Sequence, residues 1–110
     1  MKRSEIVQEI KTVLQRVAPD AEVILYGSEA RGDARIDSDI DLLILVNREN
    51  LTYKEKVDIT NPLYDLELLG DYSVNISPLV YTRKQFHFLS FHTTDVLTCT
   101  AVFLKRHPCL

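Results

Sequence analysis

Two aspartates, Asp39 and Asp41, stand at the start of an apolar run, Ile40 to Val46, that has the length and composition of a β-strand. A run this apolar normally lies in the middle of a sheet with both faces covered. Because side chains alternate along a strand, the two carboxylates are expected to point to the same face. Aspartate is depleted in strands, and two like charges this close repel each other. The presence of two aspartates at the start of this strand therefore requires a physical explanation.

A divalent cation between the carboxylate oxygens would remove this repulsion. Mg²⁺ suits such a place, because it is a hard ion that is usually held by one or two carboxylates together with substrate phosphates. The simpler alternative is a solvated turn in which Ser38 or Asp39 is a turn residue. The pair opens directly into the apolar run, however, and follows a glycine-serine turn. We therefore predict that Asp39 and Asp41 are the catalytic and metal-binding residues.

The glycine-serine turn, Gly27 and Ser28, follows a first apolar run that ends at Tyr26. Glycine lets the backbone approach a ligand closely, and serine can cap the following helix or bind a phosphate. A helix N-terminus attracts anions, and Arg31 in the first turn would add positive charge. An ordinary strand-to-helix turn would explain Gly27 and Ser28 alone. Together with the aspartates, Gly27, Ser28 and Arg31 are predicted to bind a nucleoside triphosphate.

Gly27-Ser28, ten intervening residues and then Asp39-Ile40-Asp41 resemble the signature of the polymerase-β-like nucleotidyltransferase superfamily. The longer string from Gly27 to Ile44 resembles the minimal nucleotidyltransferase (MNT) family, whose small members often serve as antitoxins of HEPN/MNT toxin–antitoxin pairs. This resemblance implies an α/β (α+β) fold with a mixed, twisted sheet flanked by helices. It also implies Mg²⁺-dependent transfer of AMP from ATP to a protein hydroxyl, with a tyrosine of a HEPN-domain toxin as the expected acceptor.

Members of the superfamily commonly have a third acidic residue on a later strand, where it completes a metal site or acts as a base. The corresponding strand is predicted at Tyr72 to Tyr81, and alternation turns Asn75, Ser77 and Leu79 toward the site. None of them is acidic, and only Asp71 at the start of the strand is a substitute. Two alternatives therefore stay open: an antitoxin that neutralises its partner by binding alone, and a nucleotidyltransferase that modifies a small molecule or an RNA end with a partner chain.

The remaining pattern alternates helices and strands, which predicts an α/β fold, and the long connections predict a sheet that is at least partly parallel. Helices are expected at Lys2–Ala18, Ser28–Asp33 and Leu51–Leu69, the last one kinked or divided at Asn61-Pro62. Strands are expected at Glu22–Tyr26, Asp39–Val46 and Tyr72–Tyr81, the last one at an edge or bulged because it contains Pro78.

After the last predicted strand, Thr82 and Gln85 have the spacing of a capping box, with Phe86 and Leu89 expected to face inward. Residues 91–110 give no clear pattern. Their apolar positions, which include Ala101 and Leu104, would suit a helix, but several threonines lower its propensity.

The 110 residues predict one domain, 1–110. A net charge of −3 argues against a protein whose main work is binding nucleic acid. No apolar stretch reaches membrane-spanning length and no signal peptide is visible, so we expect no membrane partner. Two cysteines near the end form neither a disulfide framework nor a zinc pattern, which favours the cytoplasm. Self-association is left open.

Overall fold

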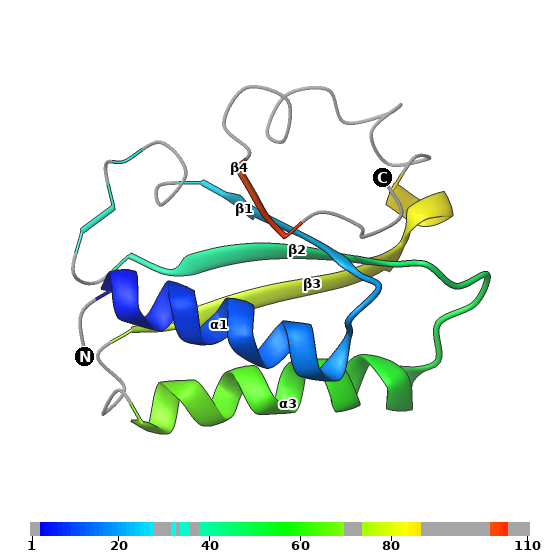
Figure 1. Cartoon of the computed structure of the whole chain (residues 1–110), viewed down its shortest axis with the longest axis horizontal. Helices are drawn as coiled ribbons and strands as arrows, with labels where there is room; N and C mark the ends of the chain where they lie inside the picture. Colours follow the sequence, from blue (N-terminus) through cyan, green and yellow to red (C-terminus); the bar gives the residue numbers. More distant parts are fainter. Residues whose placement is uncertain are drawn as a thin grey trace.

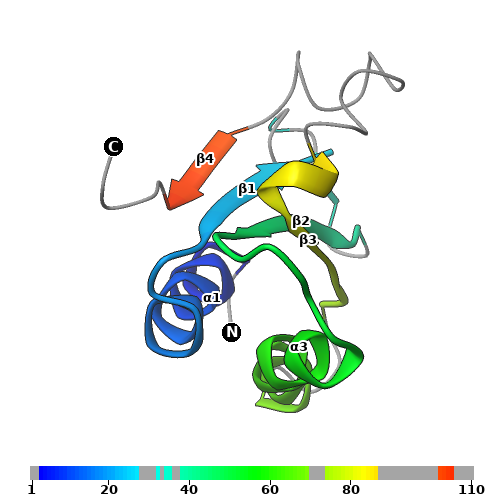
Figure 2. The same ribbon diagram turned by 90° about the vertical axis from the view of Figure 1, so that its right-hand side faces the viewer.

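The computed structural model describes residues 3–27, 32, 34–35, 38–69, 74–86 and 102–105. In this part of the chain, helices α1 (Arg3–Val17) and α3 (Tyr53–Leu69) lie side by side on one face of a four-stranded sheet (Figures 1 and 2). The strands are β1 (Glu22–Tyr26), β2 (Ile40–Val46), β3 (Ile76–Thr82) and β4 (Val102–Lys105), in the spatial order β3-β2-β1-β4. Strand β1 is antiparallel to β2 and β4, whereas β2 is parallel to β3. The predicted mixed sheet with flanking helices is confirmed.

Helix α1 forms because its apolar residues recur on one stripe that faces the sheet, and Pro19 follows its end. The buried residues of this stripe are Ile6, Ile10, Val13 and Leu14. The predicted helix is confirmed to within a residue at each end, and the predicted strand Glu22–Tyr26 is confirmed without change. No described helix is both long and apolar enough to cross a lipid bilayer.

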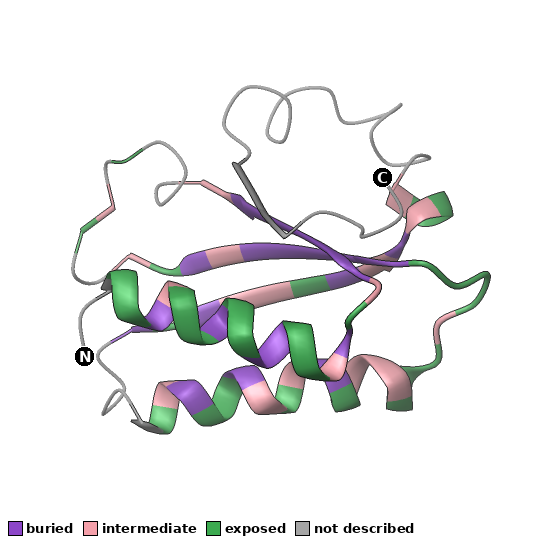
Figure 3. Cartoon of the chain, viewed as in Figure 1, coloured by how far each residue is buried: buried purple, intermediate pink, exposed green. Residues whose placement is uncertain are grey.

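Alternation along the central strand β2 divides the core into two parts. Figure 3 shows that most of this strand is buried. The side chains of Ile40, Leu42, Ile44 and Val46 belong to the main core, which also contains the buried residues of α1 and α3. Leu43 and Leu45 belong to a second cluster with Ile24, around which Tyr26, Tyr81 and Phe86 pack. Asp41 shares the alternation of Leu43 and Leu45, so its side chain lies on the face of the sheet opposite the helices.

Helix α3 runs through Pro62 as one helix, so the alternative of two helices is wrong. Proline in a helix removes one backbone hydrogen bond and costs about 3 kcal/mol. The cost is offset because three residues around the proline, Ile59, Leu63 and Leu66, are buried at helical spacing against the sheet. Packing therefore overrides the local helix-breaking tendency.

Strand β4 occupies residues for which the sequence pattern suited a helix, so that expectation is wrong for Val102–Lys105. Its residues pair with the free edge of β1, with Ile24 opposite Phe103 and Leu25 opposite Val102. The pairing supplies backbone partners that a sequence pattern does not reveal. At the opposite edge lies β3, as expected from Pro78.

The predicted capping box after β3 is confirmed. The Thr82 N–H donates to Gln85 Oε1 at 2.9 Å, and the Gln85 N–H donates to Thr82 Oγ1 at 3.1 Å. Phe86 packs against the second cluster as expected, while Leu89 lies outside the described residues. Next to the cap, Arg83 forms an ion pair with the buried Glu22 at the start of β1. These contacts fix the end of β3.

The other end of β3 is held by Glu67 of α3, whose Oε1 accepts a hydrogen bond from the Ile76 N–H at 2.6 Å. We expect Glu67→Ala to lower the free energy of unfolding by about 1–2 kcal/mol, because the partly buried N–H loses a charged acceptor. Glu67→Gln keeps an acceptor oxygen and should lose less. Urea unfolding followed by circular dichroism measures both, with Asp65→Ala at an exposed position of α3 as the control. Equal losses in Glu67→Ala and Asp65→Ala would contradict this role.

Candidate active site

Three strand ends meet at Asp41. The antiparallel register places Tyr26, the last residue of β1, opposite Asp41. The parallel register places Ser77, the second residue of β3, beside Asp41 on its other side. Paired residues on neighbouring strands project to the same face, so all three side chains lie on the face opposite α1 and α3. Asp41 is half-buried there, at the end of the sheet where β1 finishes and β2 and β3 begin.

Gly27 packs directly against the Asp41 carboxylate. Its φ of +73° lies in the left-handed region that favours glycine, and a Cβ built on it would lie 2.5 Å from Asp41 Oδ2. No side chain fits there unless the carboxylate moves. The prediction that Gly27 lets the backbone approach a ligand stays a prediction, and the close approach that the structure shows is to Asp41.

Asp39 lies immediately before β2 and is exposed, so the prediction that its carboxylate shares the face of Asp41 stays a prediction. Among the described residues, no group of three or more His, Cys, Asp or Glu side chains could hold a metal ion. Within the described part of the chain, the predicted donor set is the two carboxylates of Asp39 and Asp41. It fits Mg²⁺, which keeps several waters and completes its shell with substrate phosphates, better than it fits an ion that needs an all-protein cage.

Two of the predicted triphosphate-binding residues, Ser28 and Arg31, lie outside the described residues, as does most of the short helix predicted at 28–33. The same holds for Asp71, the substitute for the third acid. The structure therefore brings Gly27 and Asp41 together and leaves the roles of Ser28 and Arg31 as predictions.

Tyr26 is a neighbour of the carboxylate that sequence reasoning missed. Burial raises the pKa of its phenol, and the negative charge of Asp41 and the nearby Tyr81 raise this pKa further. The phenol therefore stays a neutral donor beside Asp41 at physiological pH. The signal that could have found it is antiparallel pairing of the two predicted strands, which brings the end of the first to the beginning of the second.

On β3, the expected site-facing position Ser77 is the register partner of Asp41, and Asn75 comes just before the strand. The Ile40 N–H donates to the Asn75 carbonyl oxygen at 2.8 Å, so the parallel alignment continues toward Asp39. Both side chains are neutral. No carboxylate therefore faces the aspartates from Asn75 or from β3.

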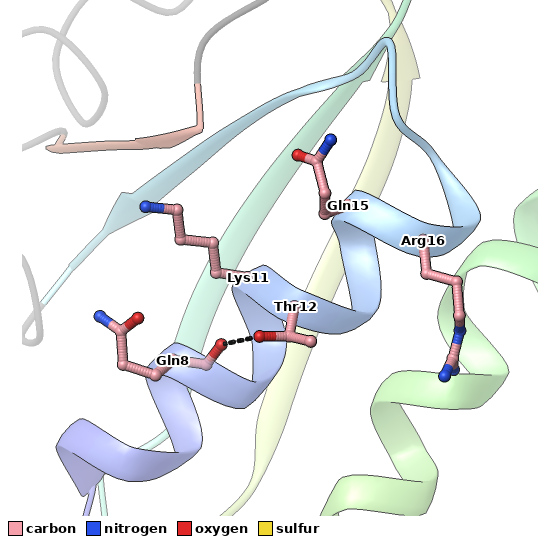
Figure 4. A pocket seen from close by; sticks show the side chains of 5 residues that line it. All are labelled: Gln8, Lys11, Thr12, Gln15 and Arg16. Carbon is pink, nitrogen blue, oxygen red and sulfur yellow. Dashed lines mark hydrogen bonds between the residues drawn. The ribbon is translucent and has the colours of Figure 1, made fainter.

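A depression on the outer side of α1 is lined, among the described residues, by polar side chains of that helix (Figure 4). They are Gln8, Lys11, Thr12, Gln15 and Arg16, and the Thr12 hydroxyl donates to the Gln8 carbonyl oxygen at 3.1 Å. These side chains are exposed on α1, whereas Asp41 lies on the face of the sheet opposite α1 and α3. This depression is therefore separate from the candidate active site.

Residues 7–102 match the nucleotidyltransferase domain family, so the chain belongs to this family of enzymes. The chain is 41% identical over 83 residues to "Putative protein adenylyltransferase MJ0141" of Methanocaldococcus jannaschii, a match that covers 72% of the chain and 79% of that protein. It is 38% identical over 79 residues to "Putative protein adenylyltransferase MJ1305" of the same organism, which covers 70% of the chain and 50% of that longer protein. The resemblance to nucleotidyltransferases is thereby confirmed.

Two solved structures share the fold. One is described as a putative nucleotidyltransferase from Sulfolobus solfataricus, with a TM-score of 0.59 at 20% identity, covering 91% of this chain and 79% of that one. The other is described as a toxin-antitoxin with AMP-PNP, with a TM-score of 0.60 at 19% identity, covering 94% of this chain and 75% of that one. The predicted nucleotidyltransferase fold is confirmed.

Two glycines allow a matched test of the contact with Asp41. Gly27 and Gly32 both have positive φ, 73° and 80°, so alanine at either position strains the backbone by about 1–2 kcal/mol. Only at Gly27 does the added Cβ meet the carboxylate, because no described residue lies within 4 Å of a Cβ at Gly32. We expect Gly27→Ala to weaken Mn²⁺ binding in the presence of ATP by about 10–100-fold, as other changes that shift a metal ligand do.

Gly32→Ala should leave Mn²⁺ binding within a few-fold of the wild type. Electron paramagnetic resonance of free Mn²⁺ gives the affinity, and thermal unfolding reports the shared backbone strain. Equal Mn²⁺ affinities in the two variants would show that the contact between Gly27 and Asp41 does not control the site.

Proposed function

We propose that the chain transfers AMP from ATP to a hydroxyl group of a partner protein, with Mg²⁺ bound at Asp39 and Asp41. The observation that carries this proposal is the half-buried Asp41 at the meeting of three strand ends, with Gly27 closed against its carboxylate. Membership of the nucleotidyltransferase family supports the reaction class, and the names of the two archaeal relatives support a protein acceptor.

In this reaction the acceptor hydroxyl oxygen attacks the α-phosphorus of ATP, the bond from this phosphorus to the β-phosphate oxygen breaks, pyrophosphate leaves, and the hydroxyl proton is released to water. Catalysis of such a transfer is mainly positioning and stabilisation of charge. A bound Mg²⁺ would supply positive charge near the triphosphate oxygens. Asp39 and Asp41 provide its protein ligands, while Gly27, Ser28 and Arg31 receive the triphosphate.

The partner that we propose is a HEPN-domain toxin, with a tyrosine as the acceptor and the present chain as the antitoxin. The resemblance of Gly27 to Ile44 to minimal nucleotidyltransferases supports this partner. The structural neighbour described as a toxin-antitoxin with AMP-PNP has the same fold, which is compatible with it.

A second candidate function is an antitoxin that binds nucleotide and partner without transfer. The neutral side chains of Asn75 and Ser77 favour it, because neither can take the proton that the acceptor hydroxyl loses. Purified protein with its partner and labelled ATP separates the two candidates. Neutralisation of the toxin by the double variant Asp39→Ala, Asp41→Ala would favour binding alone.

Asp41→Asn replaces the carboxylate by an amide of the same shape, so the fold should be retained. We expect the rate of AMP transfer from α-³²P-ATP to fall by at least about a hundredfold, the scale of losing one interaction with developing charge. Asp65→Asn removes an exposed charge of α3 and should leave the rate unchanged. Label that still reaches the partner at the wild-type rate in Asp41→Asn would refute the site assignment.

Asn75→Asp and Ser77→Asp each place an acid where the described strand has none. If transfer is slow because a proton acceptor is missing, one of them should raise the rate by about tenfold or more, since a positioned base contributes about 10²–10⁴-fold. Each added charge also repels Asp39 and Asp41, so the variant should be less stable without Mg²⁺ and regain stability with it. The initial rate of label incorporation is the measurement, and unchanged rates in both variants would contradict this explanation.

A further inference from the structure

Strand β3 lies at the edge of the sheet, so half of its backbone groups point away from β2. The hydrogen bond from the Ile40 N–H to the Asn75 carbonyl oxygen fixes which half this is. Odd-numbered residues bond to β2, because Ile40 pairs with Ile76 in the parallel register. The outward-facing residues are Ile76, Pro78, Val80 and Thr82.

Three of these four positions offer no free N–H to an incoming strand. The Ile76 N–H donates to Glu67 Oε1, and the Thr82 N–H donates to Gln85 Oε1. Pro78 has no N–H. Along the described length of β3, the Val80 N–H is therefore the one outward donor that is available. A whole strand cannot add to this edge with a complete ladder, but a short segment can pair with Val80.

A groove opens at this same residue, between α3 and the edge of β3. It is lined by Lys56 and Thr60 of α3 and by Pro78, Leu79, Val80 and Tyr81 of β3. Leu79 is 45% exposed, so the groove has an apolar rim. Its volume of ≈ 200 Å³ is smaller than the roughly 300–1,000 Å³ of typical small-molecule sites. It is large enough for one or two side chains of a peptide.

The charge of the groove indicates which kind of peptide it could bind. Lys56 contributes the ammonium group of the groove, and in the described part of the chain it takes part in no ion pair. Its neighbour Glu55 is instead paired with Arg48, and Thr52 donates a second hydrogen bond to Glu55. Lys56 and the Thr60 hydroxyl are therefore available donors beside the Val80 N–H. Such a set suits a carboxylate side chain next to a backbone carbonyl group.

We propose that this groove docks an extended acidic segment of the acceptor protein, whose backbone carbonyl accepts from the Val80 N–H and whose carboxylate binds Lys56. Only the identity of the partner rests on the proposed function. Val80 is three residues from Ser77, or about 10 Å along the strand. A segment docked at Val80 and running along β3 would therefore approach the end of the sheet where Asp41 lies.

The test is a titration of the ¹⁵N-labelled protein with acetyl-Ala-Glu-Val-Ala-amide, followed by the amide signals of the protein. We expect the Val80 amide to shift at millimolar peptide, an affinity typical of so few contacts. The same peptide with Gln in place of Glu should bind at least about tenfold more weakly, as should Lys56→Glu with the acidic peptide. Lys54→Glu makes the same charge change at an exposed position of α3 and should bind like the wild type.

The proposal is overturned if the Val80 amide does not shift, if the Gln peptide binds equally well, or if Lys54→Glu and Lys56→Glu behave alike. The proposal would also be overturned by a dimer in sedimentation whose contact, followed by the amide signals, is the edge of β3. The occupant of the groove would then be a second copy of the chain. The titration contains neither ATP nor metal, and Asp41→Asn should bind the peptide as the wild type does. Loss of transfer with intact peptide binding thus counts against the proposed reaction alone, and loss of peptide binding with intact transfer counts against the groove alone.

Discussion

Side-chain alternation along the central strand β2 is the constraint on which the site depends. Ile40, Leu42 and the later even-numbered residues are locked into the main core. A shift of pairing by one residue would move Asp41 into this core and transfer those apolar side chains to the face of Leu43 and Leu45. Burying an unpaired carboxylate costs several kcal/mol, and the main core would also lose the apolar side chains of β2 that fill it. The hydrophobic core therefore determines the face and the register at which the carboxylate is presented.

Around Asp41, the residues paired with it across both strands are uncharged. A tyrosine phenol is neutral at physiological pH, and burial and the nearby carboxylate raise the pKa of Tyr26 further. Ser77 is the partner on β3, and Gly27 leaves no side chain in front of the carboxylate. A lysine or arginine at these paired positions would form a permanent ion pair and compete with a metal ion for the oxygens. Under the proposed function, the uncharged partners of Asp41 on β1 and β3 add no positive charge that would repel a Mg²⁺ ion.

The sequence was sufficient to predict those elements in which the local pattern and the tertiary packing agree. The stripe of α1, the alternation of β2 and the spacing of Thr82 and Gln85 each follow from periodicity or side-chain reach, and each prediction was confirmed. It was insufficient where a distant segment supplied the partner. Strand β4 forms because β1 has a free edge, and α3 continues through Pro62 because its neighbours are buried. Tyr26 was missed for the same reason, since its closeness to Asp41 exists only through antiparallel pairing.

Most outward N–H groups at the edge of β3 are occupied or missing, and this affects how a nucleotidyltransferase could select a protein acceptor. An open edge strand pairs with almost any extended chain, because backbone groups are the same in every protein. Here Glu67 and Gln85 occupy two of the outward N–H groups and Pro78 lacks one, which removes most of this indiscriminate binding. What stays available is one backbone donor beside the side chains of Lys56 and Thr60. Recognition must then depend on the side chains of the partner, and side chains can distinguish one protein from another.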